Sequence, residues 1–189
     1  MTYHLIHGIH TQGPAPIEAL KDWLPKGSVK YPDYGFVLGV ETRLINPVVV
    51  GSLLPYVDKQ DVVIAHSNGC AIAYDMVQRG LEVRGLVFIN AALGAYIVRP
   101  PGVGWIDVYF NHGDEWTVAA QLAADLGLAD TVWGEMGHSG YQGNDPKIQN
   151  IDCAETNSMP RVSGHHDFFT PSKVLYWGPF LARRIVQNG

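Results

Sequence analysis

The sequence of 189 residues lacks the features that mark several classes of protein. Its 13 basic residues are outnumbered by 18 acidic ones, which leaves a net charge of −5. Nucleic-acid binding depends on a basic surface, so we expect no nucleic acid as a main partner. No apolar run reaches the roughly 18 residues of a membrane span, and the N-terminus has no secretory signal pattern. We therefore expect a cytoplasmic protein without a membrane span.

Cysteine is also scarce, with only Cys70 and Cys153 in the chain. Two thiols in a protein without a secretory signal are expected to be free and not joined in a disulfide. Repeats and low-complexity tracts are absent as well. The length and a composition that is 47% hydrophobic and 16% charged predict a single globular domain over residues 1–189.

What the chain does contain is an alternation of short apolar runs with longer amphipathic segments. The apolar runs, typical of strands buried on both faces, occupy residues 3–6, 35–40, 61–65, 85–89, 105–110 and 148–153. The helical patterns occupy residues 14–24, 46–57, 69–79, 115–126 and 171–186, the last with a candidate break at Gly178-Pro179. This alternation predicts an α/β fold, a doubly wound and mostly parallel sheet of about six strands with helices on both faces. Ligand sites of such sheets lie at the carboxyl ends of the strands.

Ser67 lies between an expected strand and an expected helix, in the segment Ile64-Ala65-His66-Ser67-Asn68-Gly69. Ala65 and Gly69, two residues away on either side, are small enough to permit a sharp and strained strand-to-helix turn. The start of the helix would bring backbone N–H groups close to a developing oxyanion. The alternative is that Ser67 is only the N-cap of the helix.

This segment resembles the G-x-S-x-G elbow of the α/β-hydrolase superfamily, with Ala65 in place of the first glycine. The resemblance implies that Ser67 is the nucleophile. It also implies an oxyanion hole made by the backbone N–H groups of Ile9 and Asn68, since His7-Gly8 follows the first strand as in that superfamily. The alternative is that Gly8 belongs to a plain strand-to-loop turn.

The superfamily's chain order of serine, acid and histidine directs attention downstream. Asp114 follows the strand expected at 105–110 in a turn that resembles the superfamily's strand-x-x-G-x-D segment, so it is our candidate for the acid. It could instead be only the N-cap of the next helix. Glu115 fits the first turn of that helix better, and Asp107 lies inside the strand, which makes it a weaker candidate.

Three downstream histidines compete for the role of the base. His138 precedes the last expected strand, so its place in the chain disfavours it. His165 and His166 follow that strand, in a segment that resembles the superfamily's H-x-D-F-F pattern with the histidine first. We predict His165 as the base and keep His166 as the alternative, and both could also be ordinary loop residues. By the same resemblance, His66 packs beneath the site as a structural residue.

The whole chain resembles a small, lidless α/β-hydrolase of the kind encoded in phage and bacterial genomes. About fifteen residues from Asn90 to Gly104 are too few for the helical cap that larger relatives insert, so we expect an open site. The resemblance implies a serine hydrolase that acts on a small-molecule carboxylic ester and needs no cofactor or metal. Apolar loop residues that could line an acyl pocket are Leu93, Tyr96, Trp116, Met136, Tyr141 and Phe168.

Three alternatives stay open from the sequence. The same triad could serve a thioesterase, an amidase or a peptidase. A metal could bind His4, His7 and His10, although residues three apart on a strand point to opposite faces and no carboxylate completes a recognised spacing. The chain could also be a non-catalytic relative of the fold that binds a small molecule or a protein.

Overall fold

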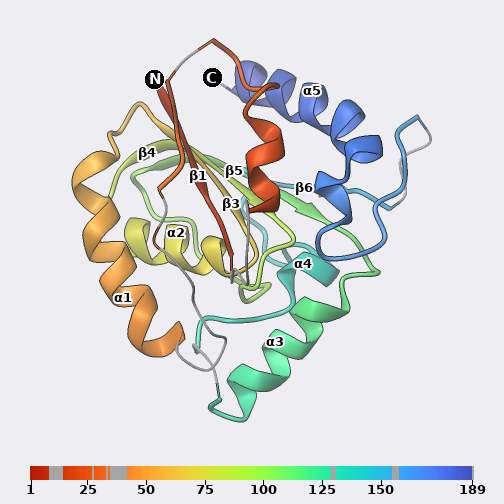
Figure 1. The fold of residues 1–189 in the computed structure, drawn as a ribbon. Helices are drawn as coiled ribbons and strands as arrows, with labels where there is room; N and C mark the ends of the chain where they lie inside the picture. The colour runs from red at the N-terminus through yellow and green to blue at the C-terminus, as the bar shows by residue number, and fades with distance from the viewer. Residues whose placement is uncertain are drawn as a thin grey trace.

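The computed structural model describes residues 1–8, 15–26, 28–32, 34, 42–128, 131–154 and 158–188 (Figure 1). The strands are β1 (Thr2–Ile6), β2 (Ser28–Lys30), β3 (Val62–His66), β4 (Val83–Ile89), β5 (Val103–Phe110) and β6 (Ile148–Asp152). The α-helices are α1 (Thr42–Leu53), α2 (Asn68–Gln78), α3 (Glu115–Asp125), α4 (Met136–Ser139) and α5 (Pro171–Asn188). Short 3-10 helices are η1 (Pro16–Leu20), η3 (Leu54–Tyr56) and η4 (Asp167–Phe169).

The strands form one sheet in the order β2-β1-β3-β4-β5-β6, and every neighbouring pair is parallel. The chain runs from β1 outward to β2, then returns past β1 to β3 and continues toward β6. The strand order therefore reverses between β1 and β3, and the crevice at the carboxyl ends of such a pair is where α/β sheets bind ligands. The predicted doubly wound, mostly parallel sheet of about six strands is confirmed.

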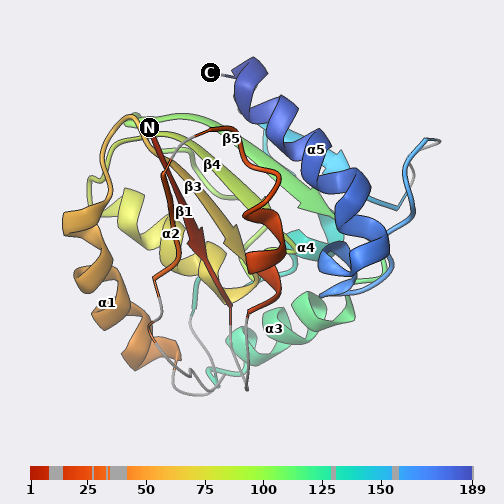
Figure 2. The same cartoon turned by 45° about the horizontal axis from the view of Figure 1, so that its top comes forward.

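Apolar cores cover both faces of the sheet, because side chains alternate along each strand. One core joins the sheet to α1 and α2, with Ile72 and Phe88 among its fully buried side chains. The other joins the sheet to η1 and α5, with Tyr109 and Trp177 fully buried. Figure 2 shows α1 and α5 on opposite sides of the sheet. Burial on both faces explains why the strands read as continuous apolar runs.

Several elements in the N-terminal part of the chain differ from the predicted ones. The predicted helix at 14–24 is only the 3-10 helix η1. The strand predicted at 35–40 lies outside the described residues, and β2 was not predicted, since it has three residues and pairs on one side only. The helix predicted at 46–57 begins earlier, at Thr42, and ends at Leu53. Pro47 thus lies inside α1 and does not mark its first turn.

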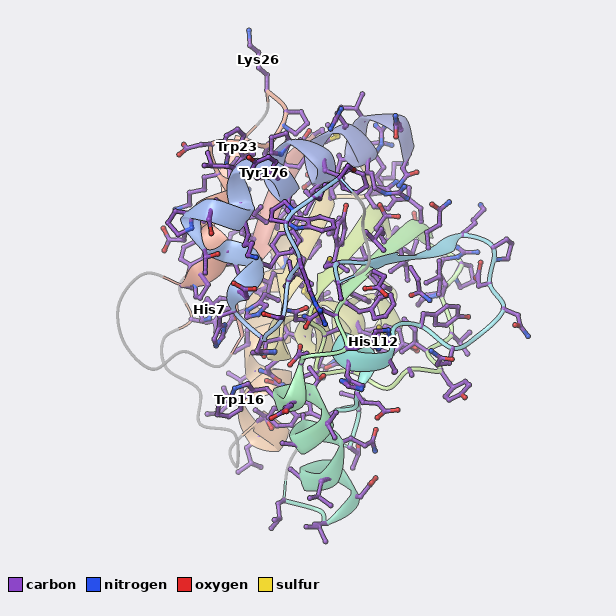
Figure 3. All side chains as sticks on the ribbon, turned by 90° about the vertical axis from the view of Figure 1, so that its right-hand side faces the viewer. His7, Trp23, Lys26, His112, Trp116 and Tyr176 are labelled. Carbon is purple, nitrogen blue, oxygen red and sulfur yellow. The ribbon has the colours of Figure 1, made fainter. Side chains whose placement is uncertain are left out.

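The helix predicted at 171–186 is present as α5, and it continues through the candidate break at Gly178-Pro179. Gly178 leaves room for Trp23: a Cβ atom there would lie 2.5 Å from Cγ of that indole. Figure 3 labels Trp23 and, on α5, Tyr176. Buried residues of α5, three or four positions apart, anchor the helix to the sheet on both sides of the proline, which offsets the hydrogen bond that a proline removes.

The connection between β4 and β5 contains no cap over the carboxyl edge of the sheet. Residues 90–102, which join these strands, contain no helix. Both chain termini lie at the opposite end of the molecule (Figure 1). Cys70 and Cys153 are free, as predicted, and burial raises the pKa of each thiol. In the part of the chain that the structure describes, no helix combines the length and the apolar character needed to cross a membrane.

Candidate active site

Ser67 forms a strained turn between β3 and α2. Its backbone has φ of 56° and ψ of −128°, a conformation that costs a residue with a side chain of the order of 1–3 kcal/mol. The residue occupies the N-cap position of α2, yet its side chain makes no capping hydrogen bond. The hydroxyl therefore does not make the hydrogen bond that the N-cap alternative requires.

Two glycines let the turn pack tightly against the end of β1. A Cβ atom on Gly69 would lie 2.4 Å from the carbonyl oxygen of Ile6. A Cβ atom on Gly8 would lie 2.6 Å from Cβ of Ser67. Both distances are far below van der Waals contact, so glycine is required at both places for Ser67 to approach the end of β1.

The structure brings Ser67, His165 and Asp114 together in a hydrogen-bonded row. Nε2 of His165 lies 2.7 Å from Oγ of Ser67. Nδ1 of the same ring lies 2.9 Å from each carboxylate oxygen of Asp114. Asp114 is fully buried, and Ser67 and His165 are each 9% exposed. The three side chains come from the β3–α2 turn, the β5–α3 turn and the loop after β6, as the sequence predicted.

Asp114 also caps the helix that follows it. Its Oδ1 accepts a hydrogen bond of 3.3 Å from the backbone N–H of Thr117 in the first turn of α3. The two interpretations of this residue are thus compatible. Glu115 is exposed in the first turn of α3. Asp107 is buried inside β5, where Nε of Arg184 donates to its carboxylate at 2.7 Å.

The other histidines have different surroundings. His138 lies on α4, and the exposed His166 is the neighbour of His165, with 4.8 Å between their ring centroids. His66 is buried beneath the row, and Nε2 of its ring lies 3.1 Å from the carbonyl oxygen of His165. Burial holds the pKa of His66 well below its ordinary value, so the ring is neutral. Since a carbonyl only accepts, Nε2 of His66 carries the proton and donates it.

Asn68 is the first residue of α2, so its backbone N–H has no acceptor within that helix. Its side chain exchanges two hydrogen bonds of 3.0 Å with the amide of Asn46 and accepts a third, at 2.8 Å, from Nε1 of Trp133. These contacts fix the residue proposed as an oxyanion donor. Ile9, the second predicted donor, lies outside the described residues.

Sequence reasoning missed the asparagine and tryptophan side chains that surround the row. Asn46 and Trp133 hold Asn68, while Asn90 and Asn111 contact the loop of His165. Asn90 and Asn111 each follow a strand directly, β4 and β5, and this position was the available signal. Asn46 and Trp133 come from distant segments, and no local pattern pairs them with Asn68.

One histidine cluster has the composition of a metal site. Among the described residues, His66, His165 and His166 offer ligand atoms within 4.8 Å of one another. Both ring nitrogens of His165 are already taken by Ser67 and Asp114, however. The residues therefore suit the hydrogen-bonded row better than a metal.

The histidines of the alternative metal site near the first strand also have hydrogen-bond partners. Nε2 of His4 lies 3.0 Å from Oδ2 of Asp61, and Nδ1 of His7 donates to the carbonyl oxygen of Gly8 at 2.7 Å. His10, the third residue of that alternative, lies outside the described residues.

The residues suggested for an acyl pocket fall into two groups. Leu93, Met136, Tyr141 and Phe168 are buried in the two cores. Tyr96 and Trp116 are 76% and 71% exposed, and Trp116 lies in the first turn of α3, next to Asp114 and Glu115 (Figure 3). Only this second group is accessible to a ligand without rearrangement.

Solved structures resemble this one over its whole length, although no family model and no curated protein matches the sequence. A hydrolase candidate of the α/β superfamily from Xanthomonas campestris pv. campestris has a TM-score of 0.58 at 15% identity, covering 100% of this chain and 99% of that one. The esterase domain of a Rhodothermus marinus protein has a TM-score of 0.59 at 11% identity, covering 100% and 88%. An esterase candidate from Staphylococcus aureus has a TM-score of 0.56 at 16% identity, covering 97% and 75%. At such identities the likeness is one of fold.

Proposed function

We propose that this chain, which has the α/β-hydrolase fold, is a serine hydrolase that cleaves carboxylic esters through an acyl-enzyme. The observation that carries the proposal is the row of short contacts from Oγ of Ser67 through His165 to Asp114, on a strained strand-to-helix turn. A serine hydroxyl needs a base to remove its proton and an acid to orient that base. The row supplies both within hydrogen-bond distance.

In the proposed mechanism, Oγ of Ser67 attacks the ester carbonyl while Nε2 of His165 takes its proton. The carbonyl oxygen becomes an oxyanion, which accepts hydrogen bonds from the backbone N–H groups of Asn68 and Ile9. The imidazolium, stabilised by Asp114, then protonates the leaving alcohol. Water, deprotonated by His165, hydrolyses the acyl-enzyme and regenerates the serine.

Two observations favour an ester as the substrate. The matched proteins from Rhodothermus marinus and Staphylococcus aureus carry the description esterase. The β4–β5 connection is too short for a cap, so a small ester needs no lid movement on that side of the site. A panel of ester, thioester and amide substrates with one common acyl group tests this choice, and we expect the ester to have the highest kcat/KM. A faster amide or thioester would reassign the leaving group and keep the triad.

The decisive experiment is covalent labelling with a fluorophosphonate, followed by mapping of the modified residue. We expect the label on Ser67 and none on the Ser67→Ala variant, whose kcat on an activated ester should fall at least about 10³-fold. Adding His165→Ala should cost little more, since the residues act as one unit. A wild-type protein that neither binds the label nor turns over any member of the panel would be a binding protein on the same fold.

A chelator provides the complementary test of the metal alternative. Because the proposed chemistry uses protein groups alone, EDTA should leave the rate unchanged. Loss of activity that added Zn²⁺ restores would instead assign a metal to the chemistry.

A further inference from the structure

We propose that Asn90 and Asn111 are positioning residues, which form a relay of two neutral amides that holds the loop of His165 against the loop of Asp114. The inference rests on the proposed function, because it assigns the relay a role in the triad of that same site. It adds that these two side chains contribute to setting the contact between base and acid.

The relay spans the two loops through a chain of hydrogen bonds. Nδ2 of Asn90 donates to the carbonyl oxygen of His165 at 2.6 Å and to that of Gly164 at 3.3 Å. Oδ1 of Asn90 accepts from Nδ2 of Asn111 at 3.1 Å. Oδ1 of Asn111 in turn accepts from the backbone N–H of Gly113, the residue before Asp114, at 3.1 Å. One end of the relay thus holds the base and the other end holds the acid.

Backbone groups at both ends fix the direction of the relay. The carbonyl groups of Gly164 and His165 can only accept, so the amide nitrogen of Asn90 must face them. Its oxygen must then face Asn111, whose nitrogen becomes the donor. This leaves the oxygen of Asn111 for the N–H of Gly113, and all the bonds are consistent. Both asparagines are buried, at 1% and 0% exposure, so water does not compete for these bonds.

The loop of His165 depends on such contacts because it has no regular structure of its own. Residues 160–163 belong to no helix or strand, and η4 begins only at Asp167. A Cβ atom on Gly164 would meet nothing within 4 Å, although its neighbour Ser163 packs closely against Gly113 and Val162 is buried. Beside this packing, polar bonds to the carbonyl of His165, from Asn90 and His66, hold the backbone that carries the ring.

The backbone of Asn90 offers a clean way to remove the relay. Its φ of 47° lies in the left-handed region, which glycine adopts without strain. Asn90→Gly therefore removes the amide and keeps the backbone, whereas alanine would also add strain. A misplacement of about 1 Å between catalytic groups can cost about 10²-fold in rate. We expect Asn90→Gly to lower kcat by about that factor with KM near the wild-type value, and to slow fluorophosphonate labelling of Ser67 in parallel.

A double-mutant cycle separates positioning from general destabilisation. In an Asp114→Asn background the contact between base and carboxylate is already lost, so adding Asn90→Gly should reduce kcat little further. Asn111→Ala should resemble Asn90→Gly, and the pair should be no worse than either alone. If Asn90→Gly lowered kcat by the same factor in the Asp114→Asn background as in the wild type, the proposal would be overturned. Asn90 would then act independently of the contact between base and carboxylate.

The chain offers a matched control. Asn150 also makes two hydrogen bonds to one backbone segment, at 2.8 Å each to the N–H and the carbonyl of Tyr141, away from the triad loops. Asn150→Ala should keep wild-type kcat. If wild-type protein labels at Ser67 but folded Asn90→Gly keeps full kcat, the relay is wrong and the proposed function stands. If the wild type itself is neither labelled nor turns over substrate, the proposed function is wrong, and the role of the relay in it is rejected with it.

Discussion

Asp114 makes contacts of two kinds with one carboxylate: it bonds the ring of His165 and caps α3. These roles place different demands on the side chain. An N-cap needs only an acceptor oxygen, which asparagine also supplies. Orienting and stabilising a protonated histidine needs a negative charge and an acceptor oxygen that faces the N–H group at Nδ1.

Asp114→Asn should therefore separate the two roles. We expect kcat to fall by about 10⁴-fold, because the amide favours the wrong tautomer of the ring. The midpoint of thermal unfolding should change little, since the cap to Thr117 is kept. Steady-state kinetics and calorimetry on the same preparation check both. A large loss of stability with modest loss of rate would show that Asp114 matters mainly as a cap.

His66 should make the stability of the protein depend on pH on the acid side. Its pKa is depressed in the fold, chiefly by burial, and is about 6.5 when unfolded. The unfolded state thus binds a proton that the folded state refuses, so the free energy of unfolding falls as pH drops below about 6.5, by up to about 1.4 kcal/mol per pH unit for this one group. His66→Gln keeps an N–H donor toward His165 and removes the titration.

We expect denaturant unfolding between pH 7 and 5 to show a smaller loss of stability in His66→Gln than in the wild type. His4, whose pKa burial also lowers, remains in both proteins and accounts for part of the residual slope. Identical pH dependence in the two proteins would show that His66 does not contribute.

At the scale of single residues, the sequence allowed us to predict the site residues that follow strands. Ser67, Asp114 and His165 each come after a strand, and parallel strands bring such positions to one edge. It could not find Asn46 as the partner of Asn68, or Arg184 as the partner of Asp107, because those contacts join segments far apart in the chain.

Among the elements, α2 begins at a close approach that only glycine permits, at Gly69. A Cβ atom on Gly69 would meet the carbonyl oxygens of Ile6 and His7 at 2.4 and 2.5 Å. Backbone atoms cannot give way as a flexible side chain can, so the helix start and Ser67 would have to move.

Gly69→Ala should therefore destabilise the fold by about 1–3 kcal/mol and lower kcat. The matched control is Gly51→Ala in α1, where a Cβ atom meets nothing within 4 Å. There alanine should stabilise by about 0.5–1 kcal/mol through helix propensity. Chemical denaturation and ester hydrolysis measure both variants. Equal effects of the two substitutions would show that the close approach at Gly69 is relieved at no cost.

Elements with strong periodicity were predictable and marginal ones were not. The helices at α2 and α3 and the strands at β3, β4 and β5 lie where their patterns indicated. β2 is too short to carry a pattern, and it forms because it pairs with β1. Gly178 of the continuous helix α5 packs against Trp23, which lies more than 150 residues earlier in the chain. Local rules for proline and glycine cannot anticipate such a contact.

In the whole molecule, an ion pair joins α5 to β5, the strand next to the edge strand β6. Arg184 donates to both carboxylate oxygens of Asp107, at 2.7 and 3.0 Å, and the carboxylate side chain is only 1% exposed. The carboxylate raises the pKa of the guanidinium and so keeps it charged. Because α5 covers one of the two cores, loss of this pair should lower the stability of the entire fold.

Arg184→Met should lower the free energy of unfolding by about 3–5 kcal/mol, because it leaves a buried carboxylate without its charged partner and with only the amide of Asn188 as a donor on α5. The specific activity of the protein that remains folded should be unchanged. Arg79→Met is the control: Arg79 pairs with Asp75 on the exposed side of α2, and such a pair contributes about 0.3–0.5 kcal/mol. Urea titrations of the three proteins give the comparison, and similar midpoints for both variants would contradict the assignment.

The strained backbone at position 67 bears on how this protein can evolve. Glycine at that position would relax the turn, so selection for stability alone favours losing the serine. Only selection for catalytic activity opposes this change. A lineage that abandons hydrolysis while keeping the fold should lose Ser67 early, whereas the cores on either side of the sheet persist. Among homologues, the residue at this one position would therefore distinguish descendants that still catalyse from those that have taken up another role.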